Sequence, residues 1–292
     1  KIGFIGVGIM GKSMVKNLMK AGFELHIYAR TKSKVEDVIG EGAQFHESIK
    51  DCVQDCDAVI TIVGFPQDVE EVYFDEGNIL DSAKEGAYLI DMTTTSPQIA
   101  EKIYAEGTKR GFHVMDAPVT GGDTGAKAGT LSILVGGEKE DYEACMPLFE
   151  AMGTNINYQG KAGCGQHCKL ANQIMIAGTL SGVCEALTYA KEQGLDPEVF
   201  MKSVATGAAG SKQLDTFGPK ILKDDYAPGF FMKHFIKDMK LALIEANRKG
   251  LSLDVLSMVL ANYEELEQEG YGDLGTQALM KFYDEEHRNT EE

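Results

Sequence analysis

The sequence lacks the features by which proteins bind nucleic acids or cross membranes. Among its 292 residues, Lys and Arg number only 28 against 45 Asp and Glu, giving a formal net charge of -17. Contacts with phosphate backbones or anionic lipids need clustered Lys and Arg, so we expect neither nucleic acid nor membrane among the partners. We also find no apolar run approaching the ~20 residues that span a bilayer, no signal-peptide pattern, no internal repeat and no tryptophan.

Cysteine is present, but its spacing is not typical of a metal site. Two C-x-x-x-C pairs, Cys52/Cys56 and Cys164/Cys168, lie far apart in the sequence, whereas structural zinc prefers tighter pairs on turns. The pattern favours free thiols in a reducing compartment, and we expect a cytoplasmic protein without a metal. Lys1 leads directly into a strand, so we expect that at least an initiator methionine is missing upstream; a cleaved targeting segment is an open alternative.

The length suits two domains, and we predict the boundary between residues 162 and 163. Residues 1–162 alternate short apolar runs with helical patterns, which predicts an α/β Rossmann-type domain with a mainly parallel sheet. The predicted strands are residues 2–6, Phe23–Ala29, Ala58–Val63, Tyr88–Asp91, His113–Asp116 and Leu131–Val135.

Residues 163–292 show helical patterns only, which predicts an all-α second domain. Its first element is a long helix, Gly163–Lys191, with no charge between Lys169 and Glu185; a helix apolar nearly all round is expected to be buried on several sides. Further helical patterns cover Pro197–Thr206, Lys233–Arg248 and Leu253–Glu267. The charged tail from Tyr283 is expected to fray.

A glycine-rich loop follows the first strand and opens a helix. It reads Gly6-Val7-Gly8-Ile9-Met10-Gly11, the G-x-G-x-x-G pattern in the strand–turn–helix context that gives it meaning. The first glycine allows the turn, the second lets a pyrophosphate approach the backbone, and the helix start receives the phosphates. We therefore predict that Gly6, Gly8, Ile9, Met10 and Gly11 bind a dinucleotide.

The end of the second strand bears on which dinucleotide is bound. NAD enzymes usually place a carboxylate there to hold the ribose hydroxyls, but here the strand ends in Ala29-Arg30-Thr31 and the next carboxylate is Glu36. Arg30 can pair with a 2′-phosphate and Thr31 can donate a hydrogen bond to it. This favours NADP, with NAD possible and a solvated surface arginine as the structural alternative.

Two loops at predicted strand ends are candidate ligand contacts. Val63-Gly64 and Thr94 follow the strands that end near Val63 and Asp91, and ligands of parallel sheets lie beyond the carboxyl ends of strands. Thr120-Gly121-Gly122 can turn N–H groups and a hydroxyl toward one anion. A turn-forming threonine and a flexible linking loop are the respective structural alternatives.

Lys169 is the leading catalytic candidate. It stands in the first turns of the long apolar helix with Asn172 three residues later, hence on one face. A lysine at such a place is costly to bury unless it has a partner or a task, and hydride transfer at a carbon bearing oxygen needs a proton donor and acceptor.

Five motifs together resemble the β-hydroxyacid dehydrogenases, the family that includes 3-hydroxyisobutyrate dehydrogenase and the tartronate and glyoxylate/succinic semialdehyde reductases. They are GFIGVGIMGKSM from Gly3, DMTTTSP from Asp91, DAPVTGG from Asp116, GCGQHCKLANQ from Gly163 and KDMKLAL from Lys237. The resemblance covers nearly the whole chain and implies an NAD(P)-dependent oxidoreductase acting on a small hydroxyacid or semialdehyde.

The resemblance also implies roles for individual residues. Thr94 matches the threonine beside the nicotinamide, Thr120-Gly121-Gly122 the loop that binds the substrate carboxylate, and Lys169 the catalytic lysine with Asn172 as its substrate-holding neighbour. Lys237 and Asp238 match a pair that reaches the cofactor and the substrate. Family members commonly form homodimers or homotetramers through the helical half, so an oligomer is expected.

Three other functions remain as alternatives. A decarboxylating dehydrogenase of the 6-phosphogluconate type shares the architecture but needs a further basic cluster, and Lys212, Lys220 and Lys223 are scattered. An imine reductase typically lacks the lysine that Lys169 supplies. A non-catalytic NADP-binding sensor or scaffold would tend to lose that lysine or gain a partner-binding domain.

Overall fold

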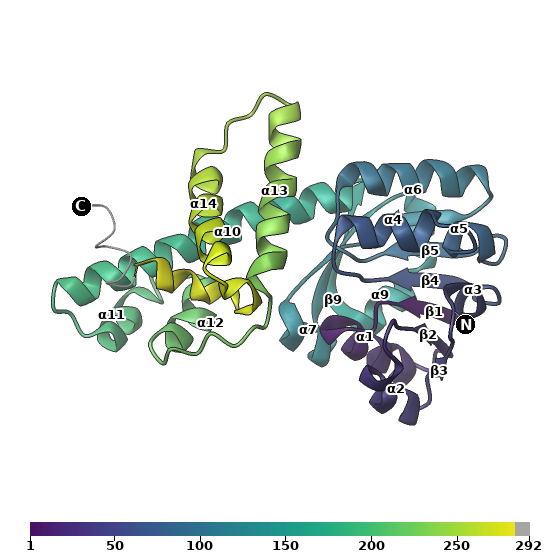
Figure 1. The fold of residues 1–292 in the computed structure, drawn as a ribbon, viewed down its shortest axis with the longest axis horizontal. Coiled ribbons are helices and arrows are strands. Elements are labelled where there is room, and N and C mark those ends of the chain that lie inside the picture. The colour runs from purple at the N-terminus through teal and green to yellow at the C-terminus, as the bar shows by residue number, and fades with distance from the viewer. Residues whose placement is uncertain (284–292) are drawn as a thin grey trace. The chain divides into compact units, whose positions relative to one another are not determined.

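The computed structural model describes residues 1–283, and the chain divides into two compact units, Lys1–Lys169 (unit 1) and Leu170–Glu292 (unit 2; Figure 1). The division falls inside helix α10 (Cys164–Glu192), later than the predicted boundary between residues 162 and 163. The first turns of α10 belong to unit 1 because they bond to its strands and loops. The predicted fraying of the tail beyond Tyr283 lies outside the described residues.

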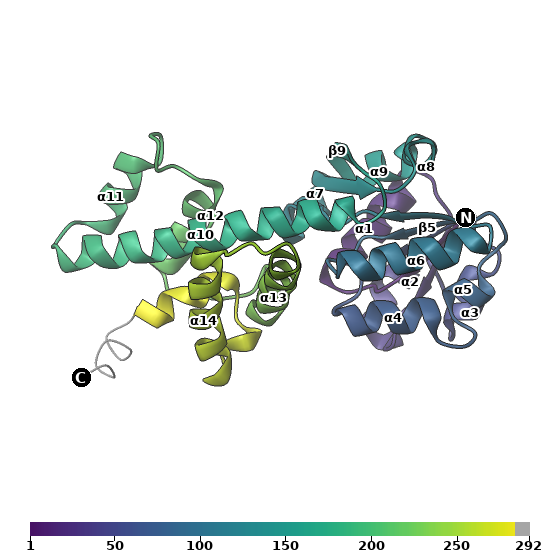
Figure 2. The ribbon, with the colours of Figure 1, turned by 90° about the horizontal axis from the view of Figure 1, so that it is seen from above.

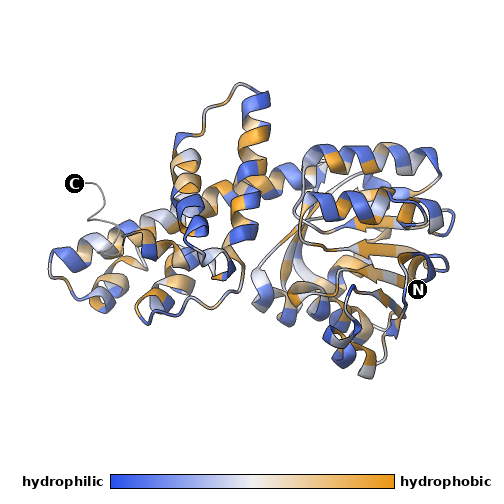
Figure 3. Cartoon of the chain, in the orientation of Figure 1, coloured by the Kyte–Doolittle hydropathy of each residue, from blue (hydrophilic) through white to orange (hydrophobic). Residues whose placement is uncertain are grey.

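Unit 1 is built on a sheet whose first six strands are parallel in the order β3-β2-β1-β4-β5-β6, as expected of the predicted α/β fold. These strands are β1 (Ile2–Ile5), β2 (Leu25–Tyr28), β3 (Gln44–Phe45), β4 (Ala58–Thr61), β5 (Tyr88–Asp91) and β6 (His113–Asp116). Figure 3 shows the central strands coloured as hydrophobic, as befits strands covered on both faces. The strand order reverses between β1 and β4, which is where doubly wound sheets bind ligands.

Three further strands extend the sheet past β6. They are β7 (Val119–Thr120), β8 (Leu131–Gly136) and β9 (Gly153–Gly160); β8 runs antiparallel to β6 and β7 and parallel to β9. The sequence did not predict β3, β7 or β9. Two of these contain only two residues, and β9 reads GTNINYQG with little buried apolar surface, so neither length nor alternation marked them.

Helices cover both faces of the sheet, as Figure 2 shows. One core cluster draws on α1 (Ile9–Lys20), α2 (Glu36–Gly40), α7 (Gly122–Ala128) and α9 (Met146–Met152). The other draws on α3 (Ile49–Val53), α4 (Pro66–Phe74), α5 (Ile79–Ser82) and α6 (Pro97–Lys109), and the short α8 (Lys139–Ala144) precedes α9. Neighbouring strand residues such as Val59 and Ile60 belong to different clusters, because side chains alternate across a strand.

Unit 2 is helical in its described residues 170–283, which confirms the predicted all-α domain; the one β contact there is an isolated bridge between Phe231 and Gly275. Around the rest of α10 lie α11 (Pro197–Val204), α12 (Lys212–Ile221), α13 (Met232–Arg248), α14 (Asp254–Gln268) and 3₁₀ segments at Tyr271–Asp273 and Thr276–Tyr283. Helix α12 was not predicted, because Gly218 and Pro219 are poor residues for a helix interior.

Helix α10 is less completely buried than its composition predicted. Leu180, Cys184 and Leu187 lie in the core of unit 2, yet Met175 and Tyr189 are 74% and 67% exposed. By length and composition α10 could also cross a membrane, and 44% of its most apolar window is buried inside the protein. The sequence holds no long uninterrupted apolar run there, so the apolar character of α10 as a whole was not predicted to suit a membrane. The core helix of a globular protein has the same length and composition.

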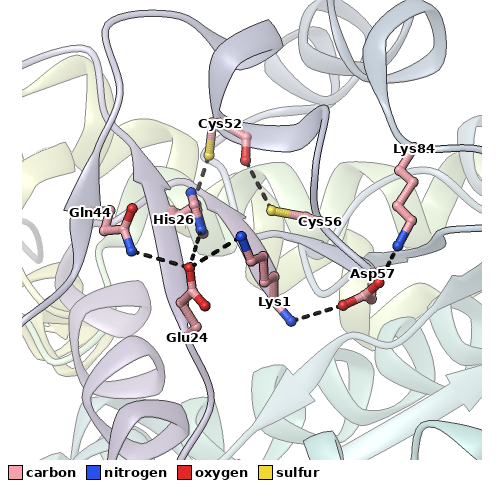
Figure 4. A network of polar contacts seen from close by, with 8 residues as sticks. All are labelled: Lys1, Glu24, His26, Gln44, Cys52, Cys56, Asp57 and Lys84. Atoms are coloured by element: carbon pink, nitrogen blue, oxygen red, sulfur yellow. Dashed lines mark hydrogen bonds and ion pairs between the residues drawn. The ribbon is translucent and has the colours of Figure 1, made fainter.

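A polar network lies at the amino-terminal ends of strands β1, β2 and β4 (Figure 4). Glu24 Oε1 is 3.0 Å from His26 Nε2, and Lys84 Nζ donates to Asp57 at 2.6 Å. Behind these groups the thiol of Cys56 bonds the carbonyl of Cys52 at 3.1 Å. Burial raises the pKa of the Cys52 thiol to about 12 and that of Cys56 to about 11, so both stay protonated at neutral pH.

Candidate functional site

The predicted dinucleotide loop sits at the point where the strand order reverses. Gly6 follows β1 with φ of 96°, and a Cβ there would lie 2.1 Å from the carbonyl oxygen of Ile62, just beyond β4. Only glycine permits this approach of the two loops. The residues predicted from two different motifs, Gly6 and Val63, are thus brought together at the carboxyl edge of neighbouring strands.

The start of helix α1 has room for a ligand at its second glycine. A Cβ on Gly8 would meet no protein atom within 4 Å, whereas one on Gly11 would lie 2.2 Å from the carbonyl oxygen of Gly6. Gly8 caps α1, Ile9 is largely exposed and Met10 is half-buried. This arrangement fits the division of labour expected of a phosphate-binding turn, with close packing at the third glycine and an open approach at the second.

The loop after β5 presents one of its three threonines. Thr93 and Thr95 are buried, and Thr94 between them is partly exposed. The hydroxyl of Thr93 accepts a hydrogen bond from Val63 N at 3.0 Å, which ties this loop to the one after β4. The loops that contain Val63, Gly64 and Thr94 therefore form one surface, and Thr94 is the threonine available to a ligand there.

Arg30 and Thr31 lie just past β2, where the sequence placed the cofactor-selecting group. The Arg30 guanidinium donates to Asp68 Oδ1 at 2.8 Å, although its side chain is 71% exposed. The other oxygen of Asp68 accepts from Phe65 N at 2.9 Å and so caps helix α4. Arg30 is therefore held by an acidic partner that the sequence analysis did not identify.

Two carboxylates that the sequence analysis gave no role lie buried side by side at the carboxyl ends of β5 and β6. Asp91 is paired with Asp116 in the sheet register. Asp91 Oδ1 accepts from the hydroxyl of Thr61 at 2.8 Å and from Thr93 N at 3.1 Å. Burial raises the pKa of Asp91 to about 6, and Asp116 adds to the effect, against hydrogen bonds from Thr93 and Thr61 that lower it.

Asp116 holds the start of helix α10. Its two oxygens accept from the backbone N–H groups of Gly163 and Gln166, each at 2.8 Å. These bonds favour the charged form, yet burial dominates and raises the pKa of Asp116. A Cβ on Gly165 would lie 2.7 Å from Asp116 O, so the helix begins in direct contact with β6.

Lys169, the predicted catalytic residue, follows on the next turn of α10. It is 7% exposed, as the sequence led us to expect of a lysine entering an apolar helix. One turn earlier, the side chain of Gln166 bonds to Thr95 N at 2.9 Å and to Thr93 O at 2.7 Å. Unit 1 thus joins the helix that carries Lys169 to the loop that carries Thr94.

The predicted anion loop Thr120-Gly121-Gly122 leaves strand β7 and enters α7. Thr120 pairs with Ser132 of β8 and is partly exposed, while both glycines are exposed. The loop is therefore open to a ligand and anchored by the sheet on one side.

The remaining predicted residues form a chain of contacts within unit 2. Asn172 Nδ2 donates to Gln173 Oε1 at 2.8 Å, Gln173 Nε2 donates to Asp238 Oδ2 at 2.7 Å, and Lys237 Nζ lies 3.1 Å from Asp238 Oδ1. Asp238 is 0% exposed and contacts Gln173 and Lys237. Its contact with a substrate stays a prediction.

Sequence reasoning missed the residues that position the site. Asp91, Asp116 and Gln166 stood inside the quoted motifs, and Gln173 ended one of them, but none was given a role. A buried glutamine or aspartate could not be recognised from spacing alone, because its partners are 47 to 73 residues away in all four bonds made by the side chains of Asp116 and Gln166. The signal available was that these polar residues interrupt otherwise apolar stretches.

Comparison with known proteins identifies the family. The model described as the NAD binding domain of 6-phosphogluconate dehydrogenase matches residues 1–160, and that described as NAD-binding of NADP-dependent 3-hydroxyisobutyrate dehydrogenase matches residues 163–283. A probable 3-hydroxyisobutyrate dehydrogenase-like 1, mitochondrial, of Arabidopsis thaliana is 45% identical over 96% of this chain and 84% of its own length.

Two more relatives extend the comparison. The 2-hydroxy-3-oxopropionate reductase of Escherichia coli is 37% identical over 87% of this chain and 86% of its own. The structure of Mycobacterium tuberculosis 3-hydroxyisobutyrate dehydrogenase with L-serine matches with a TM-score of 0.88 and 27% identity, over 96% of this chain and 97% of that one. With an open glycine turn and a partly exposed threonine where a nicotinamide dinucleotide would lie, this chain belongs to the β-hydroxyacid dehydrogenases, a family of NAD(P)-dependent oxidoreductases.

Proposed function

We propose that this chain is an NADP(H)-dependent reductase of small carboxylate-bearing semialdehydes, or dehydrogenase of the matching β-hydroxyacids, with Lys169 as general acid and base. Membership of the family supports the reaction class. The second family model is described as that of an NADP-dependent 3-hydroxyisobutyrate dehydrogenase, and the name of the Escherichia coli relative describes reduction of a hydroxylated oxo-acid.

The observation that carries the proposal is the position of Lys169. Its side chain is 7% exposed and lies one turn of α10 beyond Gln166, whose side chain contacts the backbone on both sides of Thr94. A lysine buried beside a loop at the carboxyl edge of the sheet is costly for a fold to keep unless it has a partner or a task, and titratable groups held in such places are often functional.

The chemistry assigns a separate task to each group. The bound nicotinamide would supply or take the hydride. Lys169 would give a proton to the substrate oxygen during reduction and take it back during oxidation, while the Thr120 loop binds the carboxylate through N–H and hydroxyl groups. On the family pattern Asn172 holds the substrate and Lys237 the cofactor.

The preference for NADP rests on Arg30 and Thr31. Strand β2 ends without a carboxylate for the ribose hydroxyls, and the exposed guanidinium of Arg30 offers a bidentate partner for a 2′-phosphate. Thr31 adds a hydroxyl at the same place.

The test is the oxidation of NADPH and of NADH by the purified chain with a panel of aldehydes. The panel comprises succinic semialdehyde, glyoxylate, tartronate semialdehyde and methylmalonate semialdehyde. Lys169→Ala should lower turnover of the preferred aldehyde by about 10²- to 10⁴-fold and leave the dissociation constant of NADPH nearly unchanged. Lys161→Ala, an exposed lysine just before α10, is the matched control and should retain full turnover.

Other outcomes distinguish the alternatives. Loss of NADPH binding in Lys169→Ala would contradict the assigned role. Tight binding of NADPH with no turnover of any aldehyde would favour a sensor or scaffold, and reduction of a cyclic imine instead of the aldehydes would favour an imine reductase.

We also propose that the chain forms a homodimer or homotetramer. Exposed apolar side chains of unit 2 support this, since Met175 of α10 and Val255 and Met258 of α14 are each more than half exposed. A Cβ on Gly178 would lie 3.7 Å from Val255, so the two helices meet beside this surface. Apolar side chains gathered in this way are typical of protein interfaces.

A further inference from the structure

Gln166 makes an unusual set of contacts for a residue without chemistry of its own. It is 0% exposed. Its side-chain oxygen accepts from Thr95 N at 2.9 Å, its side-chain nitrogen donates to Thr93 O at 2.7 Å, and its backbone N donates to Asp116 at 2.8 Å. The orientation of the amide is fixed, because a backbone N–H can only donate and a carbonyl oxygen can only accept.

The two side-chain bonds of Gln166 hold the backbone on both sides of Thr94. Thr93 and Thr95 are both buried, so the loop can turn only Thr94 outward. On its far side the loop is tied down by Thr93, whose hydroxyl accepts from Val63 N and whose N–H donates to Asp91. Gln166 completes the anchorage from the helix side.

The same residue fixes the helix that carries Lys169. Asp116 bonds the first turn of α10 through the N–H groups of Gly163 and Gln166. Residues three apart on a helix lie on neighbouring positions of one face, so Lys169 follows Gln166 along the helix. All these contacts lie within residues 1–169, which form one compact unit.

We propose that Gln166 is a positioning residue that holds Lys169 and Thr94 at a fixed separation and so sets the alignment of proton donor and cofactor. The proposal deepens the proposed function and rests on it. The side chain acts by joining the helix of Lys169 to the loop of Thr94. Misplacement of reacting groups by about 1 Å can lower a rate by about 10²-fold.

Two substitutions of Gln166 distinguish the effect of its hydrogen bonds from the effect of its side-chain volume. Gln166→Met keeps the length of the side chain and removes both bonds. Gln166→Glu keeps an acceptor for Thr95 N, but its ionised carboxylate cannot donate to Thr93 O, whereas its protonated form can. Ile103 is a core residue of α6 itself and makes none of these hydrogen bonds, so Ile103→Ala is the control for a general loss of stability.

The kinetic test compares kcat, KM and the dissociation constant of NADPH over a range of pH. We expect Gln166→Met to lower kcat by about 10- to 100-fold with a much smaller change in NADPH affinity. The activity of Gln166→Glu relative to the natural chain should rise as the pH falls. Ile103→Ala should melt at a lower temperature but keep its kcat.

A second readout does not depend on turnover. Hydrogen exchange at the amide of Thr95 should be faster in Gln166→Met, because that N–H loses its partner, and unchanged in Ile103→Ala. A natural chain that reduces no aldehyde would defeat the proposed function while leaving this exchange measurable. Unchanged exchange, or a kcat for Gln166→Met within twofold of the natural chain, would overturn the role of Gln166.

Discussion

The two units bury carboxylates next to the predicted site residues in different ways. In unit 1, Asp116 accepts two backbone N–H groups, and Asp91 accepts a hydroxyl and a backbone N–H. In unit 2, Asp238 is held by the side chains of Gln173 and Lys237. The acids of unit 1 thus accept backbone N–H groups, whereas the acid of unit 2 contacts two side chains, an amide and an ammonium group.

This difference has a physical consequence. Backbone donors cannot leave without deforming a strand or a helix, so Asp116 fixes the geometry of the loop and helix around Lys169. The contacts of Asp238 depend on a long side chain and on a glutamine that also bonds Asn172. We infer that the contacts of Asp116 within unit 1 are the more rigid and that the contacts from Asn172 to Lys237 within unit 2 are the more adjustable.

The largest effect should come from breaking the ion pair of unit 2. Lys237→Met removes the cation next to Asp238 and leaves a carboxylate oxygen that accepts no hydrogen bond from the described residues. Removing one partner of a buried ion pair costs about 3–5 kcal/mol, which chemical unfolding followed by circular dichroism would measure.

Two variants check this explanation. Lys240 lies on the same helix as Lys237, and Lys240→Met breaks its exposed pair with Glu264 of α14. This substitution should change the free energy of unfolding by less than about 1 kcal/mol. The double variant Lys237→Met/Asp238→Leu removes both charges and should regain most of the stability lost in Lys237→Met. If the two single lysine variants are equally stable, the distinction between buried and exposed pairs fails.

A smaller effect should appear in the pH dependence of unit 1. The pKa of Asp91 is raised to about 6 in the fold and is about 3.9 in an unfolded chain. The folded state therefore binds this proton more tightly, so the contribution of Asp91 to stability is complete below about pH 4 and is lost by about pH 6. The full loss, about two pKa units at about 1.4 kcal/mol each, amounts to about 3 kcal/mol, of which about 2 kcal/mol falls between pH 4 and pH 7.5.

The effect must be measured as a difference between the natural chain and Asp91→Asn, because other acids act in the opposite sense. The hydrogen bond from Lys84 is the largest cause that lowers the pKa of Asp57 to about 2, and such groups lose stability in acid. The free energy of unfolding of Asp91→Asn, minus that of the natural chain, should rise by about 2 kcal/mol between pH 4 and pH 7.5. If the difference in the free energy of unfolding does not change with pH, the pKa of Asp91 is not raised in the fold.

Features of the fold that depend on residues close together in the sequence could be predicted, and features that depend on tertiary packing could not. The turn at Gly6–Gly11 was predictable because glycine sterics act within a few residues, and the buried strands because their apolar runs are short and bounded by turns. Strand β9 escaped because it is polar, and β3 and β7 because they are short. The exposure of Met175 and Tyr189 depends on what packs around α10, which composition does not record.

The same distinction between local and distant partners applies to the candidate site. The residues predicted to face a ligand, such as Thr94 and Lys169, stood in motifs that could be read directly from the sequence. Residues that hold them, such as Gln166 and Asp116, act through partners 47 to 73 positions away. The acidic partner of Arg30 is Asp68, 38 positions later, and it bears on the predicted choice of NADP.

The smallest effect concerns this exposed pair. The Arg30–Asp68 bond lies at the surface, where ion pairs contribute about 0–1 kcal/mol. If Arg30 binds the 2′-phosphate of NADP as proposed, Asp68 competes with that phosphate for the same guanidinium. Asp68→Asn keeps an acceptor for Phe65 N and removes the charge. We expect the ratio of kcat/KM for NADPH to that for NADH to rise by about two- to tenfold, since tenfold corresponds to about 1.4 kcal/mol.

The control for this prediction is Glu71→Gln, which removes an exposed charge from the same helix α4 without touching Arg30. It should leave the cofactor ratio unchanged, and neither substitution should shift the melting temperature appreciably. A ratio that falls in Asp68→Asn would mean that Asp68 orients Arg30 toward the phosphate instead of competing with it. A ratio that stays constant would mean that Arg30 does not contact the cofactor. Arg30→Ala distinguishes these two explanations. It should weaken the use of NADPH if Asp68 orients Arg30 toward the phosphate, and should leave it unchanged if Arg30 does not contact the cofactor.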